Sequence, residues 1–390
     1  MKSLYSLTPQ KLILSIAFYI SLLIVAGFIL LNAEKYQNDA DAKVYYLAGR
    51  LLTSGNINKI YDISYQERAN DQFFVQVKSA ILFINTPAAA LVFAPLTFLS
   101  FYHFYVIQVI LSTLLIGFSV FLLCRKLDIK SEYCIALVIF LPVLSAISHA
   151  QITALIFLFY VLSIINFKKP LVSGFFAGLL FLKPQHLLFV PLLFLIVKSR
   201  EDKLKFLKGF ALSFFTLVLI NVFIYGSTVF TDYYNFMIGS RNKLLVQAEM
   251  YEGYNLRAAA TFLDPLLGYA TSSALLSAVE LILYTAALLA VTASKHWKNA
   301  ISAAVIFALA LNIHTKYIDL LILIIPIILL LSTLKFDLLP KKIPQRIDQL
   351  KKLFVVIVLL CFPITNFAAN YALSAVLLVF CAFWICTVQD

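Results

Sequence analysis

The run LILSIAFYISLLIVAGFILL (Leu12–Leu31) gives way to NDADAKVYY (Asn38–Tyr46), and this change from apolar to polar sequence decides the fold of the chain. An apolar run of about twenty residues crosses a ~30 Å hydrocarbon core as an α-helix. The run is too long for the apolar core of a signal peptide and no small-x-small cleavage site follows it, so we interpret it as an uncleaved first transmembrane helix with its N-terminus inside. Two acids and two tyrosines then stand where this helix emerges into water.

The composition indicates the class of protein. Hydrophobic residues make up 62% of the chain and charged residues only 13%, whereas charged residues reach about a quarter of a soluble domain. The apolar runs are continuous over about twenty residues, while the strands of a membrane β-barrel alternate over about ten. The sequence therefore predicts an all-α polytopic membrane protein.

The net charge of +12 comes largely from basic residues in short loops between apolar runs, such as Arg125-Lys126, Lys168-Lys169 and Lys341-Lys342. This pattern is typical of cytoplasmic loops that contact anionic lipid head groups, and it argues against a nucleic-acid partner. The five cysteines lie in or at the ends of apolar runs without CxxC spacing. Neither a disulfide framework nor a zinc site is expected.

The run Ile81–Leu99 is long enough to span but contains Asn85, Pro87 and Pro95. If it spanned, Arg125-Lys126 and every later basic loop would lie outside, against the positive-inside rule. We therefore interpret it as non-spanning, which gives about twelve transmembrane helices of roughly span length and two cytoplasmic termini in a single integral domain, residues 1–390. The later apolar runs lie near 103–124, 132–148, 150–166, 170–182, 185–198, 207–225, 271–293, 299–313, 317–334, 352–367 and 370–387.

This topology predicts an external loop at 32–102 that carries interfacial helices, a second large external loop at 226–270 and a basic cytoplasmic loop at 335–351. It also places most of the polar residues capable of chemistry on the external side. Because polar groups near membrane depth are costly, they are functional candidates by default. They fall around Asp39 and Asp41 and in the segments Ser148–Gln151, Lys183–His186, Gly226–Tyr269 and Asn312–Tyr317.

Simpler interpretations of these residues remain open. Asp39-Ala40-Asp41 matches a D-x-D divalent-metal pattern, yet either acid could cap a helix. Lys183 could be a lysine at a broken helix end whose amine reaches water. His314 could be a hydrogen-bonded turn residue, and Tyr45 and Tyr46 could be interface aromatics.

Several short motifs carry a resemblance to a known family. Asp41-Ala42-Lys43-Val44-Tyr45-Tyr46-Leu47-Ala48, followed by Gly55 and Tyr61-Asp62, resembles the D-x-x-V-Y-Y-x-A…G…Y-D opening of glycosyltransferase family 87. Asn85-Thr86-Pro87 with Pro95-Leu96, Lys183-Pro184-Gln185, and His314 to Leu320 are similar to its Y-P-P…P-L, K-P-Q and H-T-x-x-Y-D-L segments. The chain departs from the family at Ala150, where a Gly is usual before Gln151, at Ile318, and at Asn255-Leu256-Arg257, where N-Q-S is frequent.

The resemblance implies a GT-C-type, polyprenyl-phosphate-mannose-dependent α-mannosyltransferase of the plasma (inner) membrane, with its active site on the external or periplasmic face. The partners would be a polyprenyl-phosphate-linked sugar donor, a lipid or glycan acceptor and membrane lipids. Inversion at the sugar requires a general base, which we expect to be Asp41. No cofactor is expected, although a divalent metal at Asp39/Asp41 stays an alternative. Residues expected to bind the donor phosphate are His314, Lys316, Lys183 and Arg257. Residues expected to bind the sugar or acceptor are Tyr45, Tyr46, His149, Gln151, Gln185, Asn255 and Asp319.

Two other classes of function compete with this one. A transporter or flippase for a lipid-linked sugar would place substrate groups near the middle of the bilayer on broken helices and often has repeated halves. No internal repeat is visible, and the candidate polar groups gather at span ends. A non-catalytic scaffold would also carry large loops, but it would not need the matches at Asp41 and at His314 to Leu320.

Overall fold

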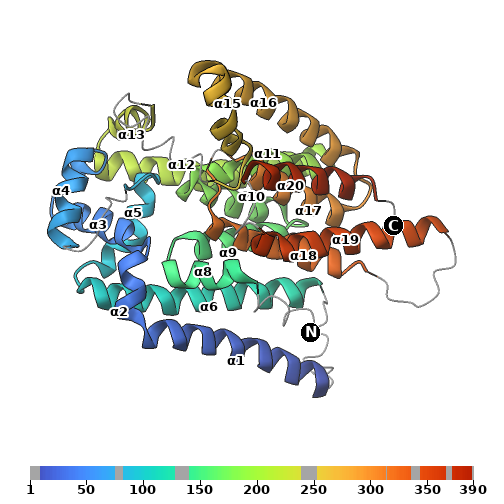
Figure 1. Ribbon diagram of the computed structural model, residues 1–390, viewed down its shortest axis with the longest axis horizontal. Helices are drawn as coiled ribbons and strands as arrows, with labels where there is room; N and C mark the ends of the chain where they lie inside the picture. Colours follow the sequence, from blue (N-terminus) through green and yellow to red (C-terminus); the bar gives the residue numbers. More distant parts are fainter. Residues whose placement is uncertain are drawn as a thin grey trace.

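The computed structural model describes residues 9–74, 82–127, 140–238, 253–312, 314–334, 343–365 and 371–388. Within these ranges the fold is all-helical and contains no strand. Long helices lie side by side as a bundle, and a group of short helices gathers at one end of it, at the left of Figure 1. The predicted all-α class is confirmed.

In the part of the chain that the structure describes, three helices are long and apolar enough to cross a membrane, namely α6 (Phe101–Leu127), α12 (Arg200–Tyr225) and α16 (Tyr269–Ala293). With a rise of ~1.5 Å per residue, helices of this length exceed the ~30 Å thickness of a hydrocarbon core. Side chains such as Leu219 and Phe223 of α12 are exposed, as expected of a helix that faces lipid. The chain is therefore a membrane protein.

The other apolar runs that the structure describes also form helices. Their bounds are α1 (Pro9–Leu31), α8 (Leu141–His149), α9 (Thr153–Ile165), α10 (Pro170–Gly178), α11 (Phe189–Ile196), α17 (Trp297–Ala310), α18 (Ile324–Leu331), α19 (Ile343–Thr365) and α20 (Tyr371–Cys386). Several are shorter than a membrane span, because the chain changes to 3-10 geometry in η4 (Leu179–Leu182), η5 (Pro184–Leu188) and η7 (Tyr317–Leu323). The count of about twelve spans stays a prediction.

The run Ile81–Leu99 forms only a short helix, α5 (Pro87–Phe93), followed by the 3-10 turn η3 (Ala94–Leu96). Pro87 stands in the first turn, where its missing N–H costs nothing. Together α5 and η3 cover only ~15 Å, about half of a hydrocarbon core. Pro87, Ala88 and Ala90 are buried against the rest of the protein, which supports a non-spanning segment.

The predicted loop at 32–102 contains the expected short helices. They are α2 (Ala33–Tyr36), η1 (Gln37–Asp39), α3 (Ala42–Thr53), η2 (Ile57–Lys59) and α4 (Ile63–Phe73), and α13 (Val229–Ile238) lies at the same end of the bundle (Figure 1). The start of α1 and the end of α20 lie away from this end (Figure 1). The assignment of this end to the external face, and the bounds of the three predicted loops, stay predictions. Residues 335–342 of the basic loop lie outside the described residues.

Helices α10 and α12 pack closely because glycines stand where they cross. A Cβ added at Gly174 would lie 2.0 Å from the Phe206 carbonyl oxygen, and one added at Gly209 would lie 1.9 Å from the Leu171 carbonyl oxygen. Small residues are the usual means by which membrane helices bring their backbones together. This contact fixes α10, and therefore the turn at Lys183 that follows it.

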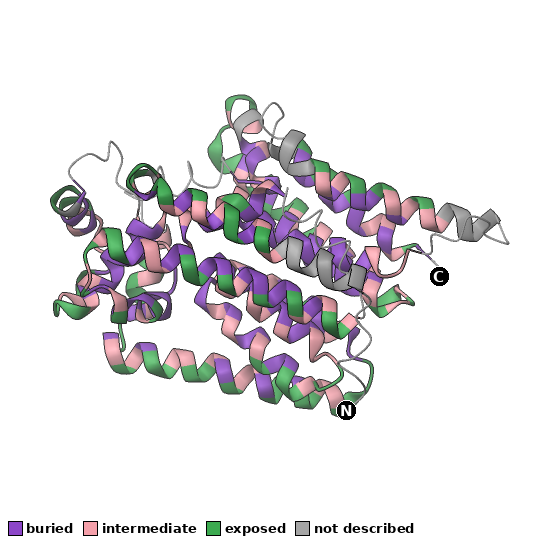
Figure 2. Ribbon diagram, turned by 90° about the horizontal axis from the view of Figure 1, so that it is seen from below, coloured by how far each residue is buried: buried purple, intermediate pink, exposed green. Residues whose placement is uncertain are grey.

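The centre of the bundle is formed by α17 together with η7 and α18, almost all of whose side chains are buried. Figure 2 shows that the helices on this side of the molecule alternate between buried and exposed turns. Ser302 and Asn299 are among the few polar residues inside α17. Because η7 begins at Tyr317, the packed core holds the residues that follow the His314–Lys316 turn in one place.

Candidate active site

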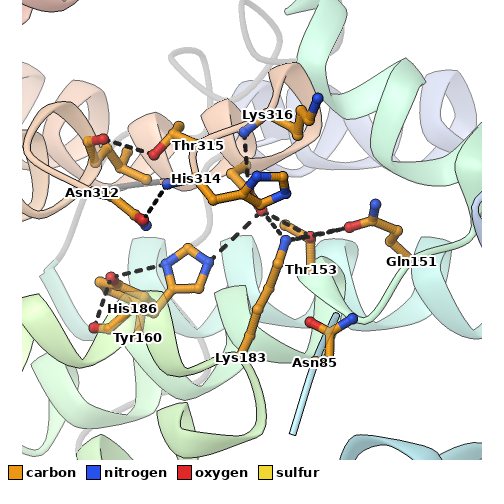
Figure 3. A network of polar contacts seen from close by, with 12 residues as sticks. Asn85, Gln151, Thr153, Tyr160, Lys183, His186, Asn312, His314, Thr315 and Lys316 are labelled. Carbon is orange, nitrogen blue, oxygen red and sulfur yellow. Dashed lines mark hydrogen bonds and ion pairs between the residues drawn. The ribbon is translucent and has the colours of Figure 1, made fainter. Parts of the chain in front are cut away.

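Polar side chains converge where helices are interrupted at the α3 end of the bundle. The contributing points are the start of α3, the junction between α8 and α9, the junction between η4 and η5, and the start of η7. Figure 3 shows side chains from three of these segments meeting in one network. Helix interruptions leave backbone groups without intrahelical partners and give short polar side chains access to the interior.

Asp41 stands at the N-cap position of α3, but its side chain makes no capping hydrogen bond there. Its Oδ2 instead accepts a hydrogen bond from Nε2 of Gln151. The simple interpretation of Asp41 as a helix cap therefore fails. The carboxylate is held instead by a residue from a distant segment, and its predicted part as a general base stays a prediction.

Gln151 is oriented by its other contacts. Its Oε1 accepts hydrogen bonds from Lys183 Nζ at 3.3 Å and from Thr153 Oγ1 at 3.0 Å. A lysine has donors only, so the amide atom that faces it must be the oxygen. The amide nitrogen is then left to face Asp41, which as a carboxylate can only accept. Lys183 thus determines which group Gln151 presents to Asp41.

Lys183 lies in the break between η4 and η5 and is only 4% exposed. Besides Gln151, its Nζ donates to Thr153 Oγ1 at 3.1 Å and to Asp319 Oδ1. An ammonium group has three donors, and all three have protein partners here. In this arrangement Lys183 neutralises Asp319, so its predicted part in binding a donor phosphate gains no support from the geometry and stays a prediction.

Asp319 is fully buried in the first turn of η7. Its Oδ1 pairs with Lys183, lies 3.1 Å from Thr153 Oγ1 and lies 3.7 Å from Nε2 of His186. Its Oδ2 accepts from the backbone N–H of Lys316 at 3.1 Å. A buried carboxylate is tolerated only when it is paired and hydrogen-bonded. Asp319 therefore ties the turn before η7 to the η4–η5 break.

Tyr45 brings α3 into the same region. Its hydroxyl accepts from Nδ2 of Asn85 at 3.2 Å, and its ring packs on Phe83 and Phe93. Burial first, and then the negative charges of Asp41 and Asp319, raise the pKa of the Tyr45 hydroxyl well above its usual value. Tyr45 stays neutral and can both donate and accept hydrogen bonds.

His314 and Lys316 lie on the short turn before η7, at the edge of the network (Figure 3). The His314 backbone N–H donates to Oδ1 of Asn312 at 2.9 Å, and Thr315 Oγ1 donates to the Leu309 carbonyl at 2.7 Å. The side chains of His314 and Lys316 are half-buried. The side chains of His314 and Lys316 thus belong to a turn that Asp319 holds through the backbone N–H of Lys316.

Ala150 separates His149 from Gln151 and has a left-handed backbone, with φ of 50°. It is the one non-glycine residue with positive φ within the described ranges. A glycine adopts this conformation without strain, which gives a physical reason for the glycine that is usual at this position in the resembling family. His149 points elsewhere, because its Nδ1 lies 2.9 Å from the Ser145 carbonyl.

The remaining predicted residues lie outside the network. The Tyr46 hydroxyl donates to the Leu99 carbonyl at 2.9 Å, and its ring packs on Phe101 and Phe104. Arg257 forms a two-pronged ion pair with Glu280 of α16, with its Nε 2.8 Å and its Nη2 2.6 Å from the carboxylate oxygens. The part of each in binding substrate stays a prediction.

Gln185 and Asn255 belong to the same group of predicted residues. Gln185 is half-buried in η5, two positions after Lys183. Asn255 is fully buried just before η6 (Leu256–Ala259), which leads into α15 (Ala260–Leu267), and neither polar atom of its amide has a hydrogen-bond partner among the described residues. A buried amide without partners is costly, which makes Asn255 a candidate for contact with a bound molecule.

Sequence reasoning missed one member of the network, Thr153, and gave another, His186, no specific role. Thr153 bridges Gln151, Lys183 and Asp319 through one hydroxyl. His186 belongs to the candidate segment Lys183–His186, and it lies against Asp319 and within 3.3 Å of the Tyr160 hydroxyl. Thr153 is a polar residue at the start of an apolar run, two positions after the candidate Gln151, and that position is the signal that could have marked it.

A metal site finds no support among the described residues, which contain no cluster of three or more His, Cys, Asp or Glu side chains. The side chain of Asp39, one half of the D-x-D alternative, lies outside the described side chains. The expected metal independence stays a prediction.

The fold and the site together describe an all-helical membrane protein in which a buried polar network holds a carboxylate at one end of the bundle. A family model gives the identity of that class: the chain belongs to glycosyltransferase family 87, whose model matches residues 83–313. The match includes Gln151, Thr153 and Lys183, and Asp41 and Asp319 flank it on either side. Neither the curated proteins nor the solved structures include a match to the chain.

Proposed function

We propose that the protein is an inverting hexosyltransferase that moves a sugar, mannose in the first instance, from a polyprenyl-phosphate donor to a lipid-linked or glycan acceptor at the external face of the plasma membrane. Membership of the family supports glycosyl transfer. The observation that carries the mechanism is the hydrogen bond from Gln151 to Asp41, which holds a carboxylate at the bundle end. The transporter alternative is not pursued, because the family is one of transferases.

The reaction in this proposal is a single in-line displacement. The acceptor hydroxyl oxygen forms a bond to the anomeric carbon while its proton passes to the Asp41 carboxylate. The bond between that carbon and the lipid phosphate oxygen breaks, and its electron pair leaves with the phosphate. A positioned base of this kind contributes roughly 10²–10⁴-fold to the rate.

Gln151 acts in this mechanism as a positioning residue. Its amide N–H donates to the carboxylate, and Lys183 and Thr153 hold the amide in that orientation. A carboxylate that accepts a charge-assisted hydrogen bond is fixed in direction. Gln151 thereby orients the carboxylate that takes the acceptor proton in this mechanism.

The leaving phosphate needs hydrogen-bond donors or positive charge in a site that excludes water. His314 and Lys316 are the best candidates, because they lie on a turn fixed through the Lys316 backbone and Asp319. Lys183 supports this turn through its ion pair with Asp319. The cationic side chain of Lys316 would then take the place of a metal ion at the leaving phosphate.

Transfer in proteoliposomes tests the proposal. Purified full-length protein is given labelled polyprenyl-phosphate mannose, polyprenyl-phosphate glucose or GDP-mannose, each with a membrane extract as source of acceptor and each with and without EDTA. We expect transfer from a polyprenyl-phosphate sugar only, unchanged by EDTA. Transfer from GDP-mannose alone would overturn the donor assignment, and strict dependence on added Mn²⁺ or Mg²⁺ would favour the Asp39/Asp41 metal alternative.

A further inference from the structure

A polar cavity lies between α3 and α4, away from the Asp41 network. It has a volume of about 350 Å³ and is lined by residues of α3, of the turn that follows it and of α4. The polar residues that line it include Arg50, Arg68, Asn56 and Tyr65, and Leu51 and Ala69 contribute apolar walls. Both charged residues that line it are arginines. The cavity therefore has the character of an anion site.

The lining residues of α4 occupy one face of that helix. Tyr65, Arg68, Ala69 and Gln72 follow the spacing i, i+3, i+4, i+7, which places them in one stripe. The acids of α4, Glu67 and Asp71, do not line the cavity. Glu67 lies on the far side of the helix from this stripe, whereas Asp71, three residues after Arg68, lies next to it on the helix surface.

The cavity is built on an anchored framework. Arg50 Nη1 donates to the Thr97 carbonyl at 3.3 Å. Gln66, on the buried side of α4, donates to the Ile60 carbonyl at 2.6 Å and accepts from the Phe83 N–H at 2.8 Å. Gly55, with φ of 76°, makes the turn that returns the chain from α3 towards η2. Arg50 is therefore fixed on α3, and Arg68 lies over the ring of Tyr65 on an α4 that Gln66 anchors.

Two guanidinium groups together with amide and hydroxyl groups are the usual recognition elements for phosphate, because the planar fork matches two phosphate oxygens. Arg50 lies about 13 Å along α3 from Asp41, at a rise of ~1.5 Å per residue. A group bound here would sit beside the site of transfer without entering it.

We propose that the α3–α4 cavity binds a phosphate group, carried by a membrane lipid or by the lipid-linked acceptor of the transfer reaction. The second source rests on the proposed function, whereas the first does not. In both cases the phosphate accepts hydrogen bonds from Arg50 and Arg68, and the attached lipid chain extends towards the bilayer.

Binding is measured on the full-length protein in an uncharged detergent, as the rise in Tm on titration with inorganic phosphate, dihexanoyl phosphatidic acid or dihexanoyl phosphatidylcholine. We expect inorganic phosphate and phosphatidic acid to raise the Tm saturably. The zwitterionic phosphatidylcholine should not. Arg68→Gln and Arg50→Gln should each weaken it by about tenfold, because each removes charge-assisted hydrogen bonds. Arg200→Gln removes the same charge from an exposed site at the start of α12 and should bind like the wild type.

The proposal would be overturned if neither inorganic phosphate nor phosphatidic acid bound, or if binding were unchanged in the variant that combines Arg50→Gln with Arg68→Gln. Arg50→Gln removes the hydrogen bond to Thr97 and could perturb α3. Arg68 is exposed, so Arg68→Gln is expected to fold and tests the proposal by itself. If the arginine variants have a raised KM for the acceptor and an unchanged KM for the donor, the bound phosphate belongs to the acceptor. Lost binding of phosphatidic acid with both KM values unchanged assigns it to a membrane lipid. If Asp41→Asn keeps its transfer activity while the arginine variants lose binding, the proposed base fails and the cavity assignment stands.

Discussion

The side-chain amide of Gln151 donates a hydrogen bond to the carboxylate of Asp41, although 110 positions separate the two residues in the chain. One end of this contact belongs to the start of α3 and the other to the left-handed turn between α8 and α9. The contact joins the predicted base to the buried ion pair of Lys183 and Asp319. Substitutions of Asp41, Gln151, Lys183 and Asp319 therefore test the proposed function.

Gln151→Leu should lower kcat for transfer by about 10- to 100-fold, because it removes a hydrogen bond of ~1.5–3 kcal/mol to a charged group. The KM for the donor should change little, since Gln151 orients the base and does not hold the lipid phosphate. Asn166→Leu, at the far end of α9 where the amide only donates to the Leu162 carbonyl, is the matched control. A tenfold or larger rise in donor KM with kcat intact would show that Gln151 binds the donor and does not position Asp41.

Asp319→Leu and Lys183→Met should each destabilise the protein by about 3–5 kcal/mol, because each leaves one buried charge without its partner. The double variant should lose much less than the sum of the two, since it leaves no buried charge. Unfolding by detergent titration measures the three values, with exposed Asp232→Asn as the control. Additive losses would mean that the two side chains do not act as a pair.

Gly174→Ala should reduce stability, because the added methyl group would lie 2.0 Å from the Phe206 carbonyl oxygen and would force α10 away from α12. Gly27→Ala in α1 meets no atom within 4 Å and should be neutral, or stabilising by up to ~1 kcal/mol from helix propensity. The Tm of both variants in detergent provides the comparison. Equal effects at the two positions would argue against the close crossing of α10 and α12.

Lys59→Cys and Lys168→Cys, each in a cysteine-free background, should react with a membrane-impermeant maleimide from opposite sides of the membrane. Lys59 lies in η2 next to α4, and Lys168 lies in the turn between α9 and α10 at the other end of the bundle. We expect Lys59→Cys to be labelled from outside and Lys168→Cys only after permeabilisation. Labelling of both from the same side would contradict the predicted topology.

The helices could be predicted from the sequence because continuous apolar runs of span length have few other folded forms. The breaks inside those runs were harder. Pro184 marked one of them, but the 3-10 geometry of Leu179–Leu182 and of Tyr317–Leu323 depends on packing that no periodicity carries. The predicted count of spans rests on run lengths alone for this reason.

The site was predicted in part. The candidates from the sequence include Asp41, Gln151, Lys183 and Asp319. Their spacing does not predict that Lys183 and Asp319, 136 positions apart, form an ion pair. Which turns meet is decided by helix packing, and local sequence does not encode it. The sequence predicts that Arg257 binds a phosphate, but in the structure Arg257 forms an ion pair with Glu280, which lies inside an apolar run. Thr153 was missed because a lone hydroxyl in such a run usually bonds its own helix.

The measurement that tests the central claim most directly is transfer from a polyprenyl-phosphate sugar by Asp41→Asn in proteoliposomes, with Asp39→Asn as the neighbouring control. Asn keeps the shape of the side chain and its contact distance to Gln151 but cannot accept the acceptor proton as a carboxylate does. We predict that Asp41→Asn loses at least about 100-fold in kcat, with expression and Tm preserved, while Asp39→Asn retains most of its activity. Near-normal transfer by Asp41→Asn would contradict the account.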